Sequence, residues 1–193
     1  MRKVERVVEV LQDGGVIAYP TDTVYGLGCD LLQPKAIERI CRIRDLDPRK
    51  ALLTLICKDI SQVARYAHQI DNDVFRLMKK NLPGPFTFIL RVGQQLPKTM
   101  RNRKGTIGVR IPDHRITQSI LELLDRPLLS ASLRSKDDVL EYENDPVEIQ
   151  ENFGNLVDLV VDGGIGGRTP SGVIECTGTE ALLIREGAFP LRN

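Results

Sequence analysis

The stretch Val16-Ile-Ala-Tyr-Pro-Thr-Asp-Thr-Val-Tyr-Gly-Leu-Gly28 decides how this chain is organised. It begins as a short apolar strand over residues 16–19 and breaks at Pro20, which has no N–H to donate to a strand ladder. Three short polar side chains, Thr21, Asp22 and Thr23, then occupy the turn that leaves the strand. In open α/β sheets, ligands bind where such turns leave the carboxyl ends of strands. An ordinary strand and turn, with Thr and Asp capping their own backbone, explains the same residues equally well.

The composition is that of an ordinary globular protein. Its 193 residues are 41% hydrophobic and 27% charged, which predicts one domain over residues 1–193 with a single core. The 27 Lys and Arg residues nearly balance the 26 Asp and Glu residues, so a basic site requires local clustering. No apolar run approaches the roughly 18–20 residues of a membrane span, and the first residues lack the apolar core of a signal peptide. We therefore expect a cytoplasmic protein with no membrane partner.

The cysteine and histidine residues argue against several classes of site. The four cysteines show no CxxC spacing, which predicts reduced thiols. The chain has two histidines, which argues against a histidine-built zinc centre and against a Ser-His-Asp triad. We expect no metal site built from the chain's own side chains. A divalent metal would more plausibly be Mg2+ that arrives with phosphates.

Short helices and strands alternate along the chain, with neither a repeat nor a long linker. The apolar spacing predicts helices over residues 4–13, 34–44, 59–67, 71–81, 114–124 and 146–153. It predicts strands over residues 16–19, 52–56, 86–92, 106–111, 128–132, 157–161, 172–176 and 182–185. The last three strands lack helices between them, so we expect a single-domain α/β fold with a mixed sheet.

Several known catalytic motifs are absent from the sequence. It contains no GxxxxGK[ST] P-loop and no GxSxG nucleophile elbow. The glycine run Gly163-Gly-Ile-Gly-Gly167 precedes no predicted helix, so we expect a turn there rather than a dinucleotide-binding loop.

Polar and basic residues instead recur where the predicted strands end. Ser130 and Ser132 close one strand, Ser171 precedes another, and Arg185 ends the last. Arg110 lies inside an apolar strand, where a guanidinium is costly unless it is paired or binds an anion. Hydroxyl and guanidinium groups that converge on one crevice would suit a ligand with phosphates and a carboxylate. Such a site can support nucleotidyl transfer by positioning and charge neutralisation alone. Each residue taken singly fits a surface or structural role better.

Six ordered motifs resemble the YrdC-like domain family. They are Tyr19-Pro-Thr-Asp-Thr-Val-Tyr-Gly-Leu-Gly28, Pro83-Gly-Pro-Phe-Thr-Phe88, Thr106-Ile-Gly-Val-Arg-Ile-Pro112, Ser130-Ala-Ser132, Pro170-Ser-Gly-Val-Ile174 and Ile184-Arg-Glu-Gly187. The resemblance implies the YrdC/RibB-like fold, a twisted mixed β-sheet with flanking helices around a basic concave cavity. Well-known members make threonylcarbamoyl-adenylate from L-threonine, bicarbonate and ATP for a tRNA modification. Members have also been linked with double-stranded RNA binding.

The resemblance also implies roles for particular residues. It places Thr21 and Thr23 in a threonine pocket, with Arg110 and Ser171 at the amino acid carboxylate and hydroxyl. The full set of implied substrate-binding residues is Thr21, Thr23, Arg110, Ser130 and Ser171. The implied catalytic residues are Arg42, Arg44, Ser132 and Arg134, and the implied nucleotide-binding residues are Arg42, Ser132 and Arg185.

Two positions depart from the pattern of the family. The family's Lys-x-Arg motif falls on Arg42-Ile-Arg44, and its Ser-x-Asn motif falls on Ser132-Leu-Arg134. Arginine does not reproduce the compact charge of lysine, and it is bulkier than asparagine, which offers both a donor and an acceptor. Together with an inserted segment over residues 45–49, these departures resemble the YciO-type branch, which lacks the standard tetrad.

Three functions stay open at this stage. The first is a threonylcarbamoyl-adenylate synthase-like enzyme with ATP, L-threonine, bicarbonate and Mg2+ as ligands. The second is a weakly active or non-catalytic protein of the YciO type that binds tRNA or double-stranded RNA. The third is another ligase or nucleotidyltransferase that uses the same cleft for a different small carboxylate. The RNA-binding reading depends on basic residues of predicted exposed turns, which are Lys79, Lys80, Lys98, Arg101, Arg103 and Lys104.

Overall fold

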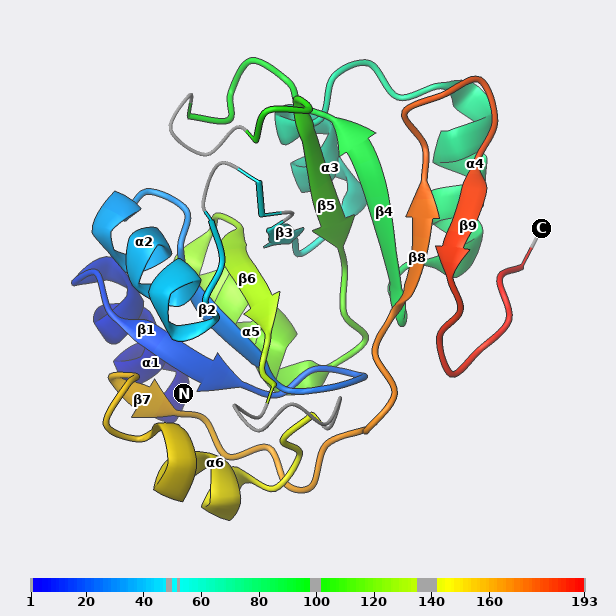
Figure 1. Cartoon of the computed structure of the whole chain (residues 1–193). Helices are drawn as coiled ribbons and strands as arrows, with labels where there is room; N and C mark the ends of the chain where they lie inside the picture. The colour runs from blue at the N-terminus through cyan, green and yellow to red at the C-terminus, as the bar shows by residue number, and fades with distance from the viewer. Residues whose placement is uncertain (1, 48–49, 52, 98–101, 135–141, 193) are drawn as a thin grey trace.

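The structure, a computed structural model, describes residues 2–47, 50–51, 53–97, 102–134 and 142–192. Its helices are α1 (Arg2–Gln12), α2 (Pro34–Ile43), α3 (Ile60–Tyr66), α4 (Asn72–Asn81), α5 (Arg115–Leu124) and α6 (Pro146–Phe153). Its strands are β1 (Val16–Tyr19), β2 (Gly26–Asp30), β3 (Thr54–Ile56), β4 (Phe86–Arg91), β5 (Thr106–Arg110), β6 (Leu128–Ser132), β7 (Leu159–Val160), β8 (Gly172–Glu175) and β9 (Leu182–Arg185). Figure 1 shows the helices packed around a strongly twisted sheet, in which β1 and β2 run across the direction of β4 and β8.

The strands of the described residues join in one nine-stranded sheet. Their order is β7-β1-β2-β6-β3-β5-β4-β8-β9. The pairs β1–β7, β3–β5 and β4–β8 are parallel, and the other neighbours are antiparallel. The predicted α/β fold with a mixed sheet is therefore confirmed. The strand predicted over residues 157–161 is limited to Leu159–Val160, next to Asp158, whose carboxylate accepts a hydrogen bond from the Val16 N–H (2.7 Å).

Strand β2 was not predicted, because two glycines and an aspartate are poor strand formers. It pairs antiparallel with β1 and with β6. A Cβ added at Gly28 would lie 2.8 Å from Cε1 of Tyr19, and one at Gly26 would lie 3.1 Å from the same atom. The ring of Tyr19 thus lies directly on the backbone of the two glycines. Glycine is needed at both positions, because a side chain there would collide with the ring.

Alternation along the paired strands separates the core from the face that carries the site. Leu129, Leu55, Val109 and Phe88 lie side by side on neighbouring strands and belong to the larger core cluster. The residues next to them in sequence must point to the other face of the sheet. There the smaller core cluster joins β1 and β6 to α1 and α5, and its members are Val7, Val8, Leu11, Ile17, Tyr19, Ile56, Ile120, Leu121, Leu124 and Leu128.

The C-terminus of α2 is closed by a Schellman motif, which fixes the direction of the chain after the helix. The Leu46 N–H donates to the Cys41 carbonyl (2.8 Å), and the Asp45 N–H donates to the Arg42 carbonyl (3.3 Å). Asp45 takes the left-handed conformation, with φ of 50°, that this motif requires. Arg44 is the C-cap residue, so its side chain leaves the helix at a fixed point.

The glycine run over residues 163–167 forms the expected turn and holds the loop between β1 and β2. The Tyr25 hydroxyl donates to the Gly164 carbonyl (2.8 Å) and accepts from the Gly163 N–H (3.0 Å). The Gly167 N–H donates to the Thr23 carbonyl (2.7 Å). The glycine turn therefore holds the segment that contains Thr21, Asp22 and Thr23 through a backbone hydrogen bond and the Tyr25 hydroxyl. Within the described part of the chain, no helix has the length and apolar character that crossing a membrane requires.

Candidate anion-binding site

A hollow of about 210 Å3 lies on the face of the sheet that carries the smaller core cluster. It is lined by Tyr19, Thr21, Val24, Tyr25, Gly26, Arg44, Leu46, Thr54, Ile56, Thr87, Arg110, Ser130, Ala131, Ser132, Arg134, Ser171, Val173 and Arg185. Its floor consists of small residues, because Thr54 lies opposite Ser130 on one neighbouring strand and opposite Gly108 on the other. A Cβ at Gly108 would lie 2.9 Å from Oγ1 of Thr54. The small side chains of this row leave the space in which a ligand can lie.

The turn over residues 21–23 encloses the guanidinium of Arg110, whose side chain is 8% exposed. Arg110 Nη2 forms an ion pair with the Asp22 carboxylate and donates to Thr23 Oγ1 (2.8 Å) and, at longer range, to Thr21 Oγ1 (3.4 Å). Thr21 in turn donates its hydroxyl hydrogen to the Val24 carbonyl (2.7 Å). The cost of a guanidinium in an apolar strand is thus offset by a partner from the chain itself. All three contacts use one nitrogen, and the Nε of Arg110 has no partner among the described residues.

Beside Arg110, strands β8 and β9 contribute a hydroxyl and a second guanidinium. The Ser171 hydroxyl forms a hydrogen bond with Thr87 Oγ1 (2.8 Å). Arg185 donates from Nε and Nη2 to the Ser171 carbonyl (3.1 and 2.8 Å). Burial lowers the pKa of Arg185, and the positive charges of Arg134 and Arg110 lower it further. Arg185 is therefore fixed in position while its charge is opposed by other cations.

The other end of the hollow holds Arg44 and Arg134. Their buried Nε atoms have no hydrogen-bond partner among the described residues. Arg134 Nη2 donates to the Tyr142 hydroxyl (2.8 Å), and its guanidinium carbon lies 5.0 Å from the centre of the Tyr142 ring. Burial lowers the pKa of Arg44, and the charge of Arg134 adds to this effect. No carboxylate in the described ranges forms an ion pair with Arg44, Arg134 or Arg185. Guanidinium groups without a carboxylate partner are suited to bind phosphate oxygens.

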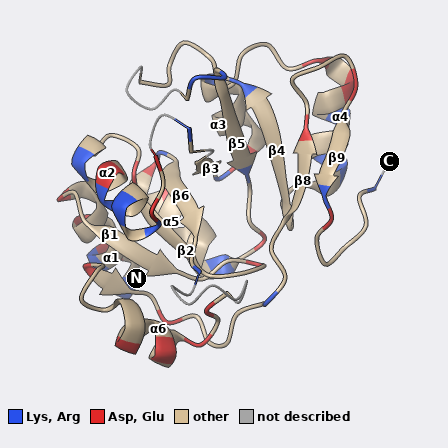
Figure 2. Cartoon of the chain, viewed as in Figure 1, with Lys and Arg blue, Asp and Glu red and all other residues tan. Residues whose placement is uncertain are grey.

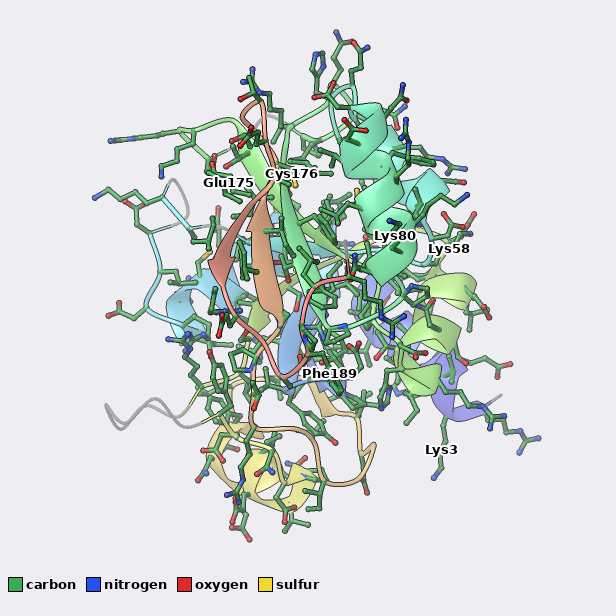
Figure 3. All side chains as sticks on the ribbon, turned by 90° about the vertical axis from the view of Figure 1, so that its right-hand side faces the viewer. Lys3, Lys58, Lys80, Glu175, Cys176 and Phe189 are labelled. Atoms are coloured by element: carbon green, nitrogen blue, oxygen red, sulfur yellow. The ribbon has the colours of Figure 1, made fainter. Side chains whose placement is uncertain are left out.

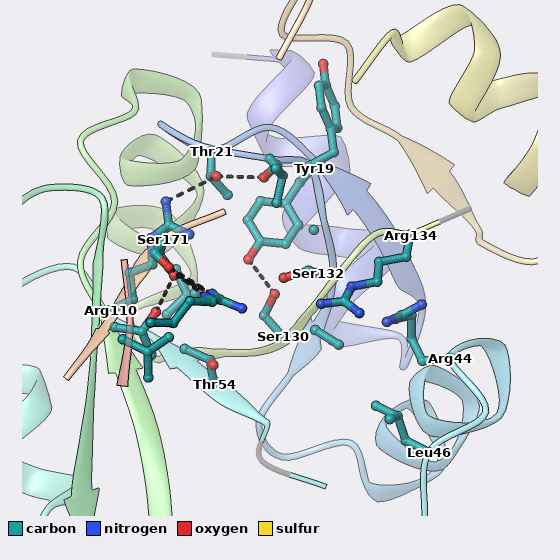
Figure 4. A pocket seen from close by; sticks show the side chains of 18 residues that line it. Tyr19, Thr21, Arg44, Leu46, Thr54, Arg110, Ser130, Ser132, Arg134 and Ser171 are labelled. Atoms are coloured by element: carbon teal, nitrogen blue, oxygen red, sulfur yellow. Dashed lines mark hydrogen bonds between the residues drawn. The ribbon is translucent and has the colours of Figure 1, made fainter. Parts of the chain in front are cut away.

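The middle of the hollow is formed by hydroxyl groups, as Figure 4 shows. Ser130 donates its hydroxyl hydrogen to the Leu27 carbonyl (2.9 Å), so Tyr19 is the donor in the contact between the Tyr19 and Ser130 hydroxyls (2.7 Å). Burial raises the pKa of Tyr19 to about 12. Both hydroxyl hydrogens are thus used within the protein, and a ligand meets Ser130 as a hydrogen-bond acceptor. Ser132 lies half-buried in the lining beside it.

The structure brings together most of the residues that the sequence analysis named. Eight of them line the hollow: Thr21, Arg44, Arg110, Ser130, Ser132, Arg134, Ser171 and Arg185. Thr23 is not in the lining, because its hydroxyl lies behind the guanidinium of Arg110 as an acceptor. Arg42 is exposed and does not line the hollow. It precedes Arg44 by two residues, and residues so spaced do not share a helix face.

Some residues of the site were not assigned a role from the sequence. Asp22 was noted on its turn, but not as the ion-pair partner of Arg110. Tyr142 was part of no motif, and it positions Arg134. Thr54 and Thr87 form part of the lining from two different strands. Thr87 stands in the motif Pro83-Gly-Pro-Phe-Thr-Phe88, and the signal for Thr54 in the sequence is a hydroxyl within an otherwise apolar strand.

Comparison with known proteins identifies the family. A model of the Sua5, YciO and YrdC proteins, described as telomere recombination, matches residues 9–187. The chain belongs to the Sua5/YciO/YrdC family. It is 42% identical to the uncharacterised protein YciO of Escherichia coli over 187 residues, which cover 96% of the chain and 89% of that protein. The crystal structure of E. coli YciO superimposes with a TM-score of 0.92 at 41% identity, and the match covers 99% of the chain and 92% of YciO.

Members of the family with a named activity are more distant. A threonylcarbamoyl-AMP synthase of Marinobacter nauticus is 32% identical over 164 residues, which cover 84% of the chain and 85% of that protein. The crystal structure of Pyrococcus abyssi Sua5 complexed with L-threonine has a TM-score of 0.88 at 28% identity, and the match covers 98% of the chain and 55% of that protein. The predicted membership of the family and its fold are thus both confirmed.

Four of the six basic residues on which RNA binding was predicted have described positions, and these four do not gather on one surface. Lys98 and Arg101 lie outside the described residues. Lys79 and Lys80 end α4, near the start of β4, whereas Arg103 and Lys104 precede β5. Because β4 and β5 are antiparallel, these pairs lie at opposite ends of the two strands. Figure 2 shows acidic segments interspersed with the basic ones, and Figure 3 shows Lys80 on the same side of the molecule as Lys3 and Lys58. RNA binding stays a prediction without a patch to support it.

Among the residues with described positions, no group of three or more His, Cys, Asp or Glu side chains could hold a metal ion. The arginine end of the hollow would repel a bare cation. A Mg2+ ion could reach this end as part of a nucleotide complex, with phosphate oxygens as its ligands.

Proposed function

We propose that this protein binds ATP, L-threonine and bicarbonate in the hollow and forms threonylcarbamoyl-adenylate, as a step toward tRNA modification. The observation that carries the proposal is the arrangement of charge in one cavity. Arg44 and Arg134 lie at one end without a carboxylate partner among the described residues, and Arg110 with its hydroxyl neighbours and Arg185 forms the opposite end. The likeness to a Sua5 structure complexed with L-threonine and to named synthases supports the same ligands.

In this proposal the amino acid lies at the Arg110 end. Its carboxylate would contact the guanidinium of Arg110, and the Ser171 and Thr21 hydroxyls lie within the same lining. The amine of threonine takes up bicarbonate with loss of water, which gives a carbamate. A carbamate oxygen then attacks the α-phosphorus of ATP, and pyrophosphate leaves. The balance is one threonine, one bicarbonate and one ATP consumed for one adenylate, one pyrophosphate and one water.

The arginine end would contribute by neutralising charge on the phosphates. Arg134 and Arg185 are already held by Tyr142 and by the Ser171 carbonyl before a ligand binds, and donors that need no rearrangement stabilise developing charge most effectively. Positioning and electrostatics of this kind suffice for transfer of a nucleotidyl group, so no side-chain nucleophile is required. A Mg2+ ion bound to the phosphates would supply further positive charge.

A pyrophosphate-release assay tests the proposal. The purified protein is incubated with ATP, L-threonine, bicarbonate and Mg2+, and each component is omitted in turn. We expect pyrophosphate only when all are present, with threonylcarbamoyl-adenylate as the second product. Calorimetry with ATP alone serves as the control for an intact nucleotide site. A protein that binds ATP but gives no pyrophosphate above the blank is not a synthase.

A second candidate uses the same cavity for another small carboxylate. It rests on Ser130, whose hydroxyl hydrogen is already used, so this residue accepts a hydrogen bond from any ligand donor and does not by itself select the hydroxyl of threonine. A thermal-shift screen of amino acids and other small carboxylates with ATP separates the two candidates, because a ligand of the native state raises its melting temperature. A larger shift with a carboxylate other than L-threonine would favour the second candidate.

A further inference from the structure

The positive charges of the four guanidinium groups in the hollow are not equally balanced by negative charge. Arg44 is opposed by the charge of Arg134, and Arg185 is opposed by those of Arg134 and Arg110. Figure 4 shows Arg110 and Ser171 at one end, Arg134 and Arg44 at the other, and the serine hydroxyls between them. Of these four arginines, only Arg110 has a carboxylate partner within the described chain, and that partner is Asp22. Asp22 thus offsets the charge of Arg110 at one end, where Arg185 also lies on Ser171, whereas Arg44 and Arg134 at the other end have no carboxylate partner among the described residues.

Asp22 is buried to nearly the same degree as the arginine it faces. The side chains of Arg110 and Asp22 are 8% and 11% exposed, and the flanking threonine hydroxyls accept from the same Arg110 nitrogen. The second carboxylate oxygen of Asp22 is buried and has no hydrogen-bond partner in the described residues. Asp22 is not in the lining of the hollow, so a ligand there meets its charge without touching it. Screening by water is weak at such burial, so the negative charge acts strongly at short range.

We infer that Asp22 is a specificity-determining residue that reserves the Arg110 end for a carboxylate and keeps phosphate groups at the other end. This inference rests on the proposed function, which supplies the two ligands. A phosphate dianion near Asp22 would meet a like charge, and juxtaposed like charges suppress the wrong ligand. A carboxylate carries a single charge and is planar, so it can use the donors of Arg110 that Asp22 leaves free. Without Asp22, all four arginines would attract phosphates, and pyrophosphate could occupy the amino acid position.

Calorimetric titration of the whole protein with inorganic pyrophosphate tests the inference. Asp22→Asn keeps one acceptor oxygen for Arg110, replaces the other oxygen by an amide NH2 and removes the charge. We expect one pyrophosphate per chain in the wild type and two in Asp22→Asn. Saturating inorganic phosphate should leave the affinity for L-threonine unchanged in the wild type and lower it at least about tenfold in the variant. Asp113→Asn is the matched control, because the exposed Asp113 lines a neighbouring hollow together with Asp22 and is expected to behave as the wild type.

The outcomes separate this inference from the proposed function. Equal stoichiometry and equal phosphate competition in the wild type and Asp22→Asn would overturn the role of Asp22, as would a wild type that binds no pyrophosphate. A change from one to two pyrophosphates, in a protein that neither binds L-threonine nor releases pyrophosphate from ATP, would support Asp22 and refute the synthase. Circular dichroism checks the fold, and Asp22→Ser replaces Asp22→Asn if the latter does not fold. If neither folds, the wild type decides, since phosphate that displaces L-threonine there contradicts the inference.

Discussion

Arg44→Ala should weaken the binding of ATP and pyrophosphate without destabilising the fold. In most proteins the loss of a half-buried side chain lowers stability. For Arg44 we expect no loss of stability. Burial and the charge of Arg134 lower the pKa of Arg44, which means that its charged form is disfavoured in the folded state. Its Nε has no hydrogen-bond partner in the described residues either. Removing the side chain therefore relieves repulsion, and the melting temperature without ligand should stay the same or rise.

The expected loss of affinity follows from one charge-assisted contact. A hydrogen bond to a charged group contributes about 1.5–3 kcal/mol. At about 1.4 kcal/mol for each factor of ten, the dissociation constant for pyrophosphate should increase about 10- to 150-fold. Arg42→Ala is the matched control, since it removes the same charge from the same segment of chain while Arg42 is exposed and outside the hollow. That control should change the dissociation constant less than about threefold, because exposed charges at a distance are screened by salt.

Calorimetry with pyrophosphate, paired with thermal unfolding of the unliganded protein, measures both effects. If Arg44→Ala and Arg42→Ala weakened binding equally, the effect would be one of general charge and the hollow would not be the anion site. If Arg44→Ala lowered the melting temperature by several degrees, Arg44 would have a structural role that the repulsion argument excludes.

Three further predictions concern the residues that shape the hollow. Gly28→Ala should destabilise the fold by about 1–3 kcal/mol, because the added Cβ would lie 2.8 Å from Cε1 of Tyr19. Gly178→Ala is the control: the nearest atom to its added Cβ is 4.0 Å away, so this variant should not lower the melting temperature in a thermal unfolding experiment. Burial raises the pKa of Tyr19 from 10.0 to about 12, so the unfolded chain loses the hydroxyl proton first as the pH rises, and the free energy of unfolding should fall between those pH values. Urea unfolding at pH 8 and pH 11 should show a smaller fall for Tyr19→Phe than for the wild type. Equal falls in the two proteins would contradict this role of Tyr19. Arg110→Ala should cost about 3–5 kcal/mol because it leaves Asp22 buried without its partner, and adding Asp22→Asn should restore part of the stability but not binding of L-threonine.

The local pattern of the sequence was sufficient for much of the fold. Pro34 at the start of α2, Asp59 at the cap of α3 and the apolar run of β1 act through neighbours in sequence, and their elements begin and end within a few residues of the prediction. Strand β2 could not be found in this way, because what makes it a strand is the ring of Tyr19 on Gly26 and Gly28. That contact exists only once β1 and β2 have paired.

The candidate site shows the same division between local and distant causes. The position of Arg110 in an apolar strand predicted that its guanidinium needs a partner. The sequence did not indicate that this partner is Asp22, 88 residues away. The assignment of both Arg42 and Arg44 to the hollow failed on a detail of geometry. Only Arg44 occupies the C-cap, where the chain turns toward the cavity, and Arg42 remains on the exposed side of α2.

Of the two arginines that depart from the family pattern, one keeps a charge outside the hollow and the other adds a charge inside it. The lysine position is Arg42, which lies outside the hollow, and the asparagine position is Arg134, which lies inside it. Arg134 thereby brings a second cation to Arg44, from the end of β6 instead of from α2. Because Tyr142 holds it by a hydrogen bond and by its ring, the guanidinium is a planar donor of fixed orientation, unlike the mobile ammonium of a lysine. This end of the cavity therefore retains the charge needed for phosphates, but it presents that charge with a geometry that favours paired contacts to two oxygens of one phosphate.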